Sequence, residues 1–351
     1  MVSRSTGAGE SHDNFGKKRY KRRREMKLRG NKGFPMAVSW ICLVFLFSIF
    51  CAFGGMAEAK DVTTLKLANG SLGSYWYTVT TTVTELLKKK VPTLEIAVSP
   101  GRGASNIPAV HQRKSDLAIS LSVTAYDGFM GRAPFKEKNE KIRQVVCLAD
   151  NPYYMVVWAN SGIKTVTDLK GKRLNVTPRG YTSEVLTQVI LEAYGMSYKD
   201  LKKTEYASNR DAIVMMKDGH IDGMTFLAGR YSSYIFDLSS ARPIRLLPLD
   251  KDKISKMTKD NPGLSQVVIP ASMYNVEGDV VALEAWLHLI ANSAVSDDVI
   301  YDMTKTLLEN INVLKEFSKG TQDLTPEQMA TDLGIPFHEG ALKYFKEKGL
   351  R

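Results

Sequence analysis

Cysteine is scarce in this sequence, and its scarcity excludes a fold held by disulfides. Three of the 351 residues are Cys, and two of them, Cys42 and Cys51, lie in an apolar stretch near the N-terminus. Only Cys147 belongs to the long segment that follows. An internal disulfide is therefore excluded there, and a large buried core must hold the fold.

Motifs that carry catalysis, nucleotides or metals are also missing. The sequence has no G-x-S-x-G elbow, and its glycine-rich segments match neither a Walker A loop nor a dinucleotide fingerprint. Its histidines stand singly, without H-x-x-x-H spacing or a Cys partner. We therefore expect no metal site, no cofactor and no enzymatic activity. These histidines are His12, His111, His220, His288 and His338.

Positive charge is concentrated at the N-terminus. Residues 1–35 hold eleven Lys and Arg against three acidic residues, a net charge of +8 out of +11 for the whole chain. The remainder is close to neutral for its size. Because the basic run adjoins an apolar segment, we interpret it as the part that stays on the cytoplasmic side, and we expect no nucleic-acid partner.

The basic run is followed by an apolar stretch, residues 36–53, and then by small residues with an A-x-A site at Ala57 and Ala59. The order basic, apolar, small is that of a secretory signal. We predict that residues 1–59 form a signal peptide and that the mature chain begins at Lys60 in the periplasm. An uncleaved membrane anchor is the alternative.

The chain after residue 60 alternates β-rich runs with runs of helical periodicity, the pattern of an α/β fold. The clearest helices are expected over 75–90, 182–194 and 297–317, each with an apolar stripe. Strands are expected over 65–68, 94–98, 117–120, 145–149, 155–159, 174–177, 221–226 and 244–247.

Three segments place small or hydroxyl residues where a strand ends and a helix begins. They are GSLGSYWY from Gly70, GRGASN from Gly101 and PRGYTSE from Pro178. A helix N-terminus presents free backbone N–H groups and the positive end of the helix dipole, which together hold an anion without a metal. One such segment is an ordinary cap or turn, but three in one chain predict an anion-binding cleft.

These segments, in order with several others, carry a resemblance over the whole mature chain. The chain is similar to the TAXI family of solute receptors for tripartite ATP-independent periplasmic (TRAP) transporters. Two departures stand out: residues 179–183 replace a phrase often rich in Gly, Ser and Thr, and Glu339 stands where Pro is usual. The first departure, at residues 179–183, affects which substrate the site would accept. The other matching phrases are GRGASNIPAVHQRKSDLAIS, SGIKTVTDLKGKRLNV, DGHIDGMTF, SDDVIYDMTKTLLE and PFHEGALKYFKEKG.

The resemblance implies a type II periplasmic-binding-protein fold, an α/β architecture of two lobes with a ligand cleft between them. We expect lobe one to comprise residues 60–153 plus 285–351 and lobe two residues 154–284. The implied ligand-binding residues are Ser71, Ser74, Tyr75, Ser105 and Asn106 from lobe one and Arg179, Thr182 and Ser183 from lobe two. Weaker candidates are Tyr153, Phe226 and Arg230.

The resemblance also implies the function. The protein would capture a small anionic solute, a glutamate-like amino acid or a dicarboxylate, with Arg179 as a charged clamp, and deliver it to the subunits of a TRAP-type membrane permease. Two alternatives remain open at this point: a ligand sensor for a membrane kinase, and an enzyme that uses the same cleft.

Overall fold

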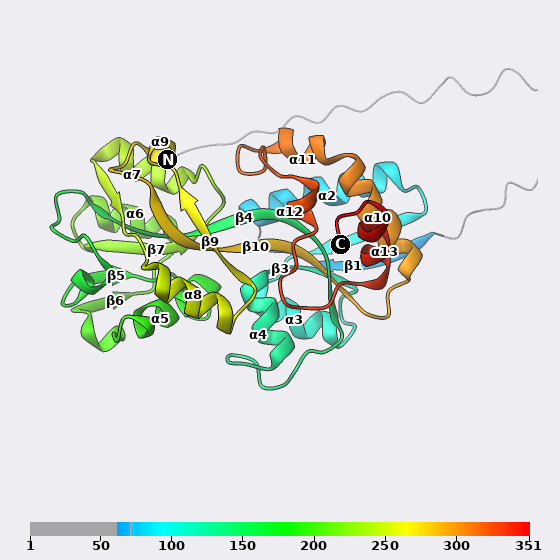
Figure 1. Ribbon diagram of the computed structural model, residues 1–351, viewed down its shortest axis with the longest axis horizontal. Coiled ribbons are helices and arrows are strands. Elements are labelled where there is room, and N and C mark those ends of the chain that lie inside the picture. The colour runs from blue at the N-terminus through cyan, green and yellow to red at the C-terminus, as the bar shows by residue number, and fades with distance from the viewer. Residues whose placement is uncertain (1–61, 71, 73) are drawn as a thin grey trace, which may run out of the picture. The chain divides into compact units, whose positions relative to one another are not determined.

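Two long strands run through the middle of the molecule in the computed structural model, which describes residues 62–70, 72 and 74–351 (Figure 1). Residues 60–351 form one unit, and the predicted signal peptide lies outside the described residues. The strands are β1 (Thr63–Ala68), β2 (Leu94–Ser99), β3 (Leu117–Leu121), β4 (Ile142–Trp158), β5 (Arg173–Asn175), β6 (Lys203–Glu205), β7 (Gly223–Leu227), β8 (Ile244–Leu246), β9 (Leu264–Ile269) and β10 (Val280–Asn292).

The helices lie between most of the strands and at the C-terminal end. No described helix is both long enough and apolar enough to cross a membrane. The helices are α2 (Tyr75–Lys90), α3 (Gly103–His111), α4 (Ser122–Met130), α5 (Thr182–Ala193), α6 (Asn209–Lys217), α7 (Ser233–Ala241), α8 (Lys251–Asp260), α9 (Ala271–Tyr274), α10 (Asp297–Glu309), α11 (Ile311–Phe317), α12 (Pro326–Met329) and α13 (Glu339–Glu347).

The sheet is mixed, with strand order β2-β1-β3-β10-β4-β7-β5-β6. The outer strands on each side pair in parallel, whereas β4 and β10 are antiparallel neighbours at the centre. Strand β8 also pairs with β4, and β9 pairs with β10. The predicted two-lobed α/β fold is therefore confirmed, with helices on both faces of each half of a curled sheet (Figure 1).

The long strands exchange partners half-way along. Strand β4 pairs with β10 as far as Pro152 and with β7 from Tyr153. Proline has no N–H to give to a sheet, so it suits the position where one ladder ends and the next begins. Strand β10 pairs with β9 up to Ala285 and with β3 from Leu287. We propose these exchanges as the boundary between lobe one and lobe two.

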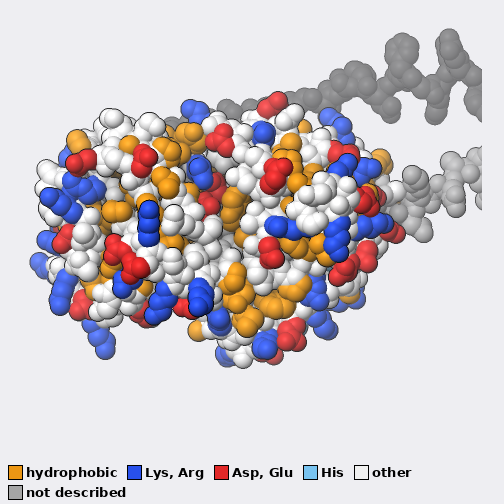
Figure 2. Space-filling view, in the orientation of Figure 1, with side chains coloured by type: hydrophobic (Ala, Val, Ile, Leu, Met, Phe, Trp, Pro, Cys, Tyr) orange, Lys and Arg blue, Asp and Glu red, His pale blue; other side chains and the backbone are white. Residues whose placement is uncertain are grey.

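Apolar burial continues across this boundary. One cluster of buried side chains includes Val146 and Leu287 in lobe one, and Val157 and Leu174 in lobe two. A second cluster fills the other face of lobe two around Phe226, and a third lies under α3 and α4 around Ile107. The surface is mixed in charge, and Figure 2 shows Lys and Arg interspersed with Asp and Glu over the visible face.

Helix α2 covers the bounds predicted from its apolar spacing, although its sequence is rich in threonine, a poor helix former. The threonine hydroxyls donate to carbonyls one turn earlier: Thr80 to Trp76 O at 2.8 Å and Thr81 to Tyr77 O at 2.9 Å. The hydroxyls are thereby satisfied inside the helix instead of competing with it.

Other elements differ from the sequence prediction. The two strands expected at 145–149 and 155–159 are one strand, β4, and β9 and β10 were not predicted as strands at all. The helix expected over 297–317 is broken at Asn310. This residue is both the C-cap of α10 and the N-cap of α11. Its side chain donates to Thr306 O at 2.8 Å, beside its own backbone N–H, which donates to the same carbonyl at 3.2 Å.

We predict that Asn106→Ala lowers the free energy of unfolding by roughly 2–4 kcal/mol. The buried Asn106 amide donates to the carbonyls of Ala68, Asn69 and Ile119 and accepts from the Arg102 N–H. Alanine would leave these groups unpaired at the end of β1, in the middle of β3 and at the start of α3. Chemical denaturation measures the loss. The control is the neighbouring exposed Ser105→Ala, expected to change stability by less than about 0.5 kcal/mol. Equal losses would contradict this account.

Candidate functional site

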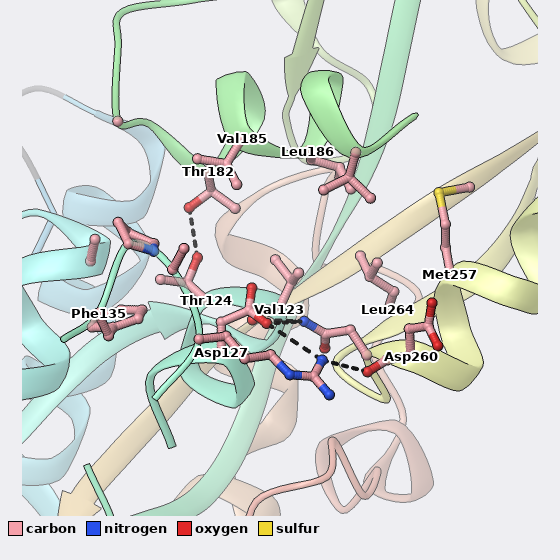
Figure 3. Close-up of a pocket in the computed structure, with 17 residues that line it drawn as sticks. Val123, Thr124, Asp127, Phe135, Thr182, Val185, Leu186, Met257, Asp260 and Leu264 are labelled. Carbon is pink, nitrogen blue, oxygen red and sulfur yellow. Dashed lines mark hydrogen bonds and ion pairs between the residues drawn. The ribbon is translucent and has the colours of Figure 1, made fainter. Parts of the chain in front are cut away.

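A cavity of about 320 Å³ lies between the proposed lobes, bounded by α3 and α4 of lobe one and by α5 and α8 of lobe two. Its size is near the lower end of the range for small-molecule sites. Figure 3 shows side chains from both lobes pointing into it. Those labelled there are Val123, Thr124, Asp127, Phe135, Thr182, Val185, Leu186, Met257, Asp260 and Leu264.

The shared strand β10 determines where the cavity forms. Its partner β9 begins at Leu264, opposite Ala285, and its partner β3 ends at Leu121, opposite Leu287. The start of α4 and the loop before β9 must therefore meet beside Trp286. Pairing along one strand thus brings α4 of lobe one against the end of α8 of lobe two.

The Ser122 hydroxyl fills this junction. It accepts from the Trp286 N–H at 2.8 Å and donates to the carbonyl of Gly263. A Cβ on Gly263 would lie 2.5 Å from the Ser122 backbone, so the approach requires glycine. The adjacent Asn261 donates from Nδ2 to Val123 O at 3.1 Å, which secures the same loop.

Three helix N-termini open on the cavity, through Ala104 of α3, Thr124 of α4, and Gly180 and Thr182 at α5. In the described part of the chain, the N-cap residues Arg102, Leu121 and Tyr181 make no side-chain cap. Such helix ends present N–H groups and a partial positive charge to a bound anion. At α5 the Glu184 carboxylate, which accepts from the Gly180 N–H at 3.2 Å, already balances part of that charge.

Two hydroxyls meet across the cavity. The Oγ1 atoms of Thr124 and Thr182 are 2.8 Å apart and form a hydrogen bond between the lobes (Figure 3). Either hydroxyl can donate, and both can turn towards a ligand oxygen. This pair joins the N-terminal turns of α4 and α5.

One turn further along α4, Asp127 supplies a carboxylate at the cavity. Its Oδ1 accepts from Asn261 Nδ2 at 3.0 Å and lies 3.9 Å from Arg132 Nη1. Burial raises the pKa of Asp127 to about 6, against the opposing effects of Arg132 and the Asn261 amide. Arg132 itself donates to Asp260 O at 2.6 Å, a second bond between the lobes.

A separate charged cluster lies where β4 and β10 change their neighbouring strands. The Arg230 Nε donates to the Asp150 carboxylate, and Arg230 Nη2 lies 3.7 Å from Glu284. Ser265 donates to Glu284 Oε1 at 3.1 Å. Burial, helped by the negative charge of Asp150 and opposed by Arg230, raises the pKa of Glu284 to about 7. Two acids and one base are thus held where β4 and β10 change lobes.

Of the predicted ligand-binding residues, Thr182 lines the cavity, and the others that the structure describes are not among its lining residues. Ser74 caps α2 by accepting from the Tyr77 N–H at 3.1 Å, and Ser183 accepts from the Leu227 N–H at 3.0 Å. The Arg179 guanidinium is exposed and lies 3.9 Å from the centre of the Tyr206 ring. Ser71 is outside the described residues.

The remaining predicted residues lie deeper or further away. Tyr75 bonds Ser318 at 3.1 Å, and its ring lies against Gly229 of lobe two. Ser105 donates to Arg102 O on the surface, while Asn106 is bonded to backbone as described above. Among the weaker candidates, Tyr153 and Phe226 are buried and Arg230 belongs to the charged cluster.

Sequence reasoning missed Thr124, Asp127 and the loop around Asn261. A signal for Thr124 was present, because Ser120, Ser122 and Thr124 follow the same rule of hydroxyls at a strand-to-helix junction as the three segments that were singled out. Among residues 62–70, 72 and 74–351, no three His, Cys, Asp or Glu side chains are grouped to hold a metal ion.

Comparison with known proteins gives a family. The model of the NMT1-like family matches residues 67–349, nearly the entire described chain. The chain belongs to the NMT1-like family. The aliphatic sulphonate binding protein SsuA of Escherichia coli is a structural match, at 14% identity over 81% of this chain and 87% of that one, with a TM-score of 0.44.

Two further solved structures match at similar levels. A TctC solute binding protein from Polaromonas shares 15% identity over 82% of this chain and 97% of its own, with a TM-score of 0.48. A protein of Bordetella bronchiseptica RB50 shares 13% over 82% and 98%, with a TM-score of 0.49.

We predict that Glu284 makes stability depend on pH between about 4.5 and 7. The folded protein binds this proton more tightly than the unfolded chain, whose Glu pKa is near 4.5. Stability therefore falls as pH rises through this window, by up to roughly 3 kcal/mol. Denaturation at several pH values should show a smaller fall for Glu284→Gln than for wild type, because Asp127, whose pKa is also raised, still contributes below about pH 6. The exposed Glu277→Gln should show the full wild-type fall, and identical pH profiles for wild type and Glu284→Gln would contradict the assignment.

Proposed function

We propose that this protein is an exported solute-binding protein that holds a small organic carboxylate between its lobes and delivers it to a TRAP-type permease. The observation that carries the proposal is the cavity at which uncapped helix ends from both lobes meet. The TAXI-like order of sequence segments supports the choice of transporter. In this proposal the protein acts in the periplasm and performs no chemistry on its ligand.

Ligand binding would work through the two lobes. A ligand that contacts α4 and α5 together favours the closed arrangement, because the open one offers it only half of these contacts. The Thr124–Thr182 and Arg132–Asp260 bonds already join the lobes beside the cavity. A permease that recognises the closed arrangement would then receive only loaded protein.

We predict that one member of a panel of small carboxylates stabilises the purified protein and is returned unchanged. At a concentration about one hundred times Kd, the folded state gains roughly 2.7 kcal/mol, which raises the melting temperature. Thermal denaturation identifies the ligand, and mass spectrometry shows whether it is altered. A panel without any shift would refute the carboxylate assignment. Failure of loaded protein to support uptake by a TRAP permease in proteoliposomes would refute the transport assignment alone.

Arg179 remains the proposed charged clamp. Its neighbour Gly180 lines the cavity, but the guanidinium must leave the Tyr206 ring to reach a ligand. A charge-assisted bond contributes about 1.5–3 kcal/mol, so Arg179→Ala should weaken binding by roughly 10- to 100-fold. Ser183→Ala should weaken it less, since Ser183 bonds the backbone of β7. Calorimetric titration with the identified ligand compares them, and wild-type affinity in Arg179→Ala would remove the clamp from the proposal.

A further inference from the structure

The walls of the cavity are mainly apolar, which bears on the class of ligand. Val123 and Phe135 contribute from lobe one, and Val185, Leu186, Met257 and Leu264 from lobe two (Figure 3). These side chains cannot pair with a charged or hydrogen-bonding group of a ligand. They offer an apolar group a place out of water, at about 25 cal/mol for each Å² that becomes buried.

Two hydroxyls and one carboxylate of the cavity lie close together, on α4 and at the start of α5. The hydroxyls of Thr124 and Thr182, with the N-terminal turns of their helices, form one polar end. The carboxylate of Asp127 follows three residues later, and residues three apart lie on the same face of a helix. An acceptor for a positive group is therefore placed one turn from the donors for a negative group.

Charge at the cavity does not favour a doubly negative ligand. Among the described residues that line it, Arg132 is the one basic side chain, against Asp127 and Asp260. Arg132 is already bonded to Asp260 O at 2.6 Å. A second carboxylate of a glutamate-like or dicarboxylate ligand would fall among apolar side chains, where an unpaired charge is costly.

Asp127 lacks a close positive partner of its own. The nearest basic nitrogen, Arg132 Nη1, is 3.9 Å from its Oδ1, beyond hydrogen-bonding distance. Burial raises its pKa, and Arg132 and the Asn261 amide offset that effect only in part. A ligand ammonium group beside it would supply the missing counter-charge.

We propose that the ligand is an α-amino acid with an apolar side chain. Its carboxylate lies at Thr124 and Thr182, its ammonium group at Asp127, and its side chain among Val185, Leu186 and Met257. This inference rests on the proposed function and replaces the glutamate-like and dicarboxylate class within it.

Calorimetric titration of the purified protein tests the ligand class. The probes are L-leucine, L-methionine, L-glutamate, succinate and 4-methylpentanoate, which is leucine without its amino group. Leucine or methionine should bind at least 100-fold more tightly than glutamate or succinate. The loss of one charge-assisted bond should make 4-methylpentanoate roughly 10- to 100-fold weaker than leucine.

Variants test the position of the ammonium group. Asp127→Asn should weaken leucine binding by roughly 10- to 100-fold and leave 4-methylpentanoate binding unchanged, which also shows that the variant is folded. Asp252→Asn, at the exposed start of α8, is the matched control and should leave both unchanged.

Each other result has a definite meaning. Preference for glutamate or succinate overturns the inference and leaves the carboxylate-binding function standing. Equal affinity for leucine and 4-methylpentanoate, or equal weakening of both by Asp127→Asn, overturns the ammonium site. If none of the five probes binds, the apolar amino acid is refuted. The wider panel of small carboxylates then tests the carboxylate-binding function itself.

Discussion

Strand β10 imposes the constraint on which the rest of the structure depends, because one edge of it is shared by both lobes. Strand β9 uses the edge up to Ala285, and β3 uses it from Leu287. The single residue between them, Trp286, donates its N–H to the Ser122 hydroxyl, which also bonds Gly263 of the other lobe. The lobes are therefore joined by main-chain pairing as well as by side-chain contacts.

The cavity and the charged cluster both follow from this constraint. On one edge of β10, the start of α4 is held against the loop after α8, and the space beside them is the cavity. On its other edge, β4 pairs with β10 around Pro152, and Asp150 and Glu284 project where Arg230 reaches them. Burying two acids with one base is unfavourable in itself. The cluster therefore makes the segment where β4 and β10 pass between the lobes sensitive to charge.

Much of the fold could be predicted from the sequence, because local patterns determine it. The apolar stripe of α2 gave its bounds correctly, and alternation of strands with helices gave the α/β class. The continuous β4 could not be predicted, because it depends on pairing first with β10 and then with β7, and the break at Asn310 leaves no signal in the apolar stripe. Strand β10 was missed because it is buried along nearly its whole length and shows no alternation of polar and apolar residues.

The site was predictable only in part. Hydroxyls at helix starts pointed to Thr182, which lines the cavity, but the same rule selected Ser74, which caps its own helix. Asn106 looked like a ligand residue, and its side chain bonds the backbone of β1 and β3. Whether a polar side chain faces a ligand or its own backbone depends on contacts between segments far apart in the chain. Asp127 is the clearest case, since its partner Asn261 lies 134 residues away.

The central claim is that a solute binds between α4 and α5. A crystal structure of the protein with the ligand that co-purifies with it would test this most directly. We predict that the ligand occupies the cavity, with its carboxylate within hydrogen-bonding distance of Thr124 and Thr182. A ligand bound elsewhere, for example at the starts of α2 and α3 with the cavity empty, would contradict the account.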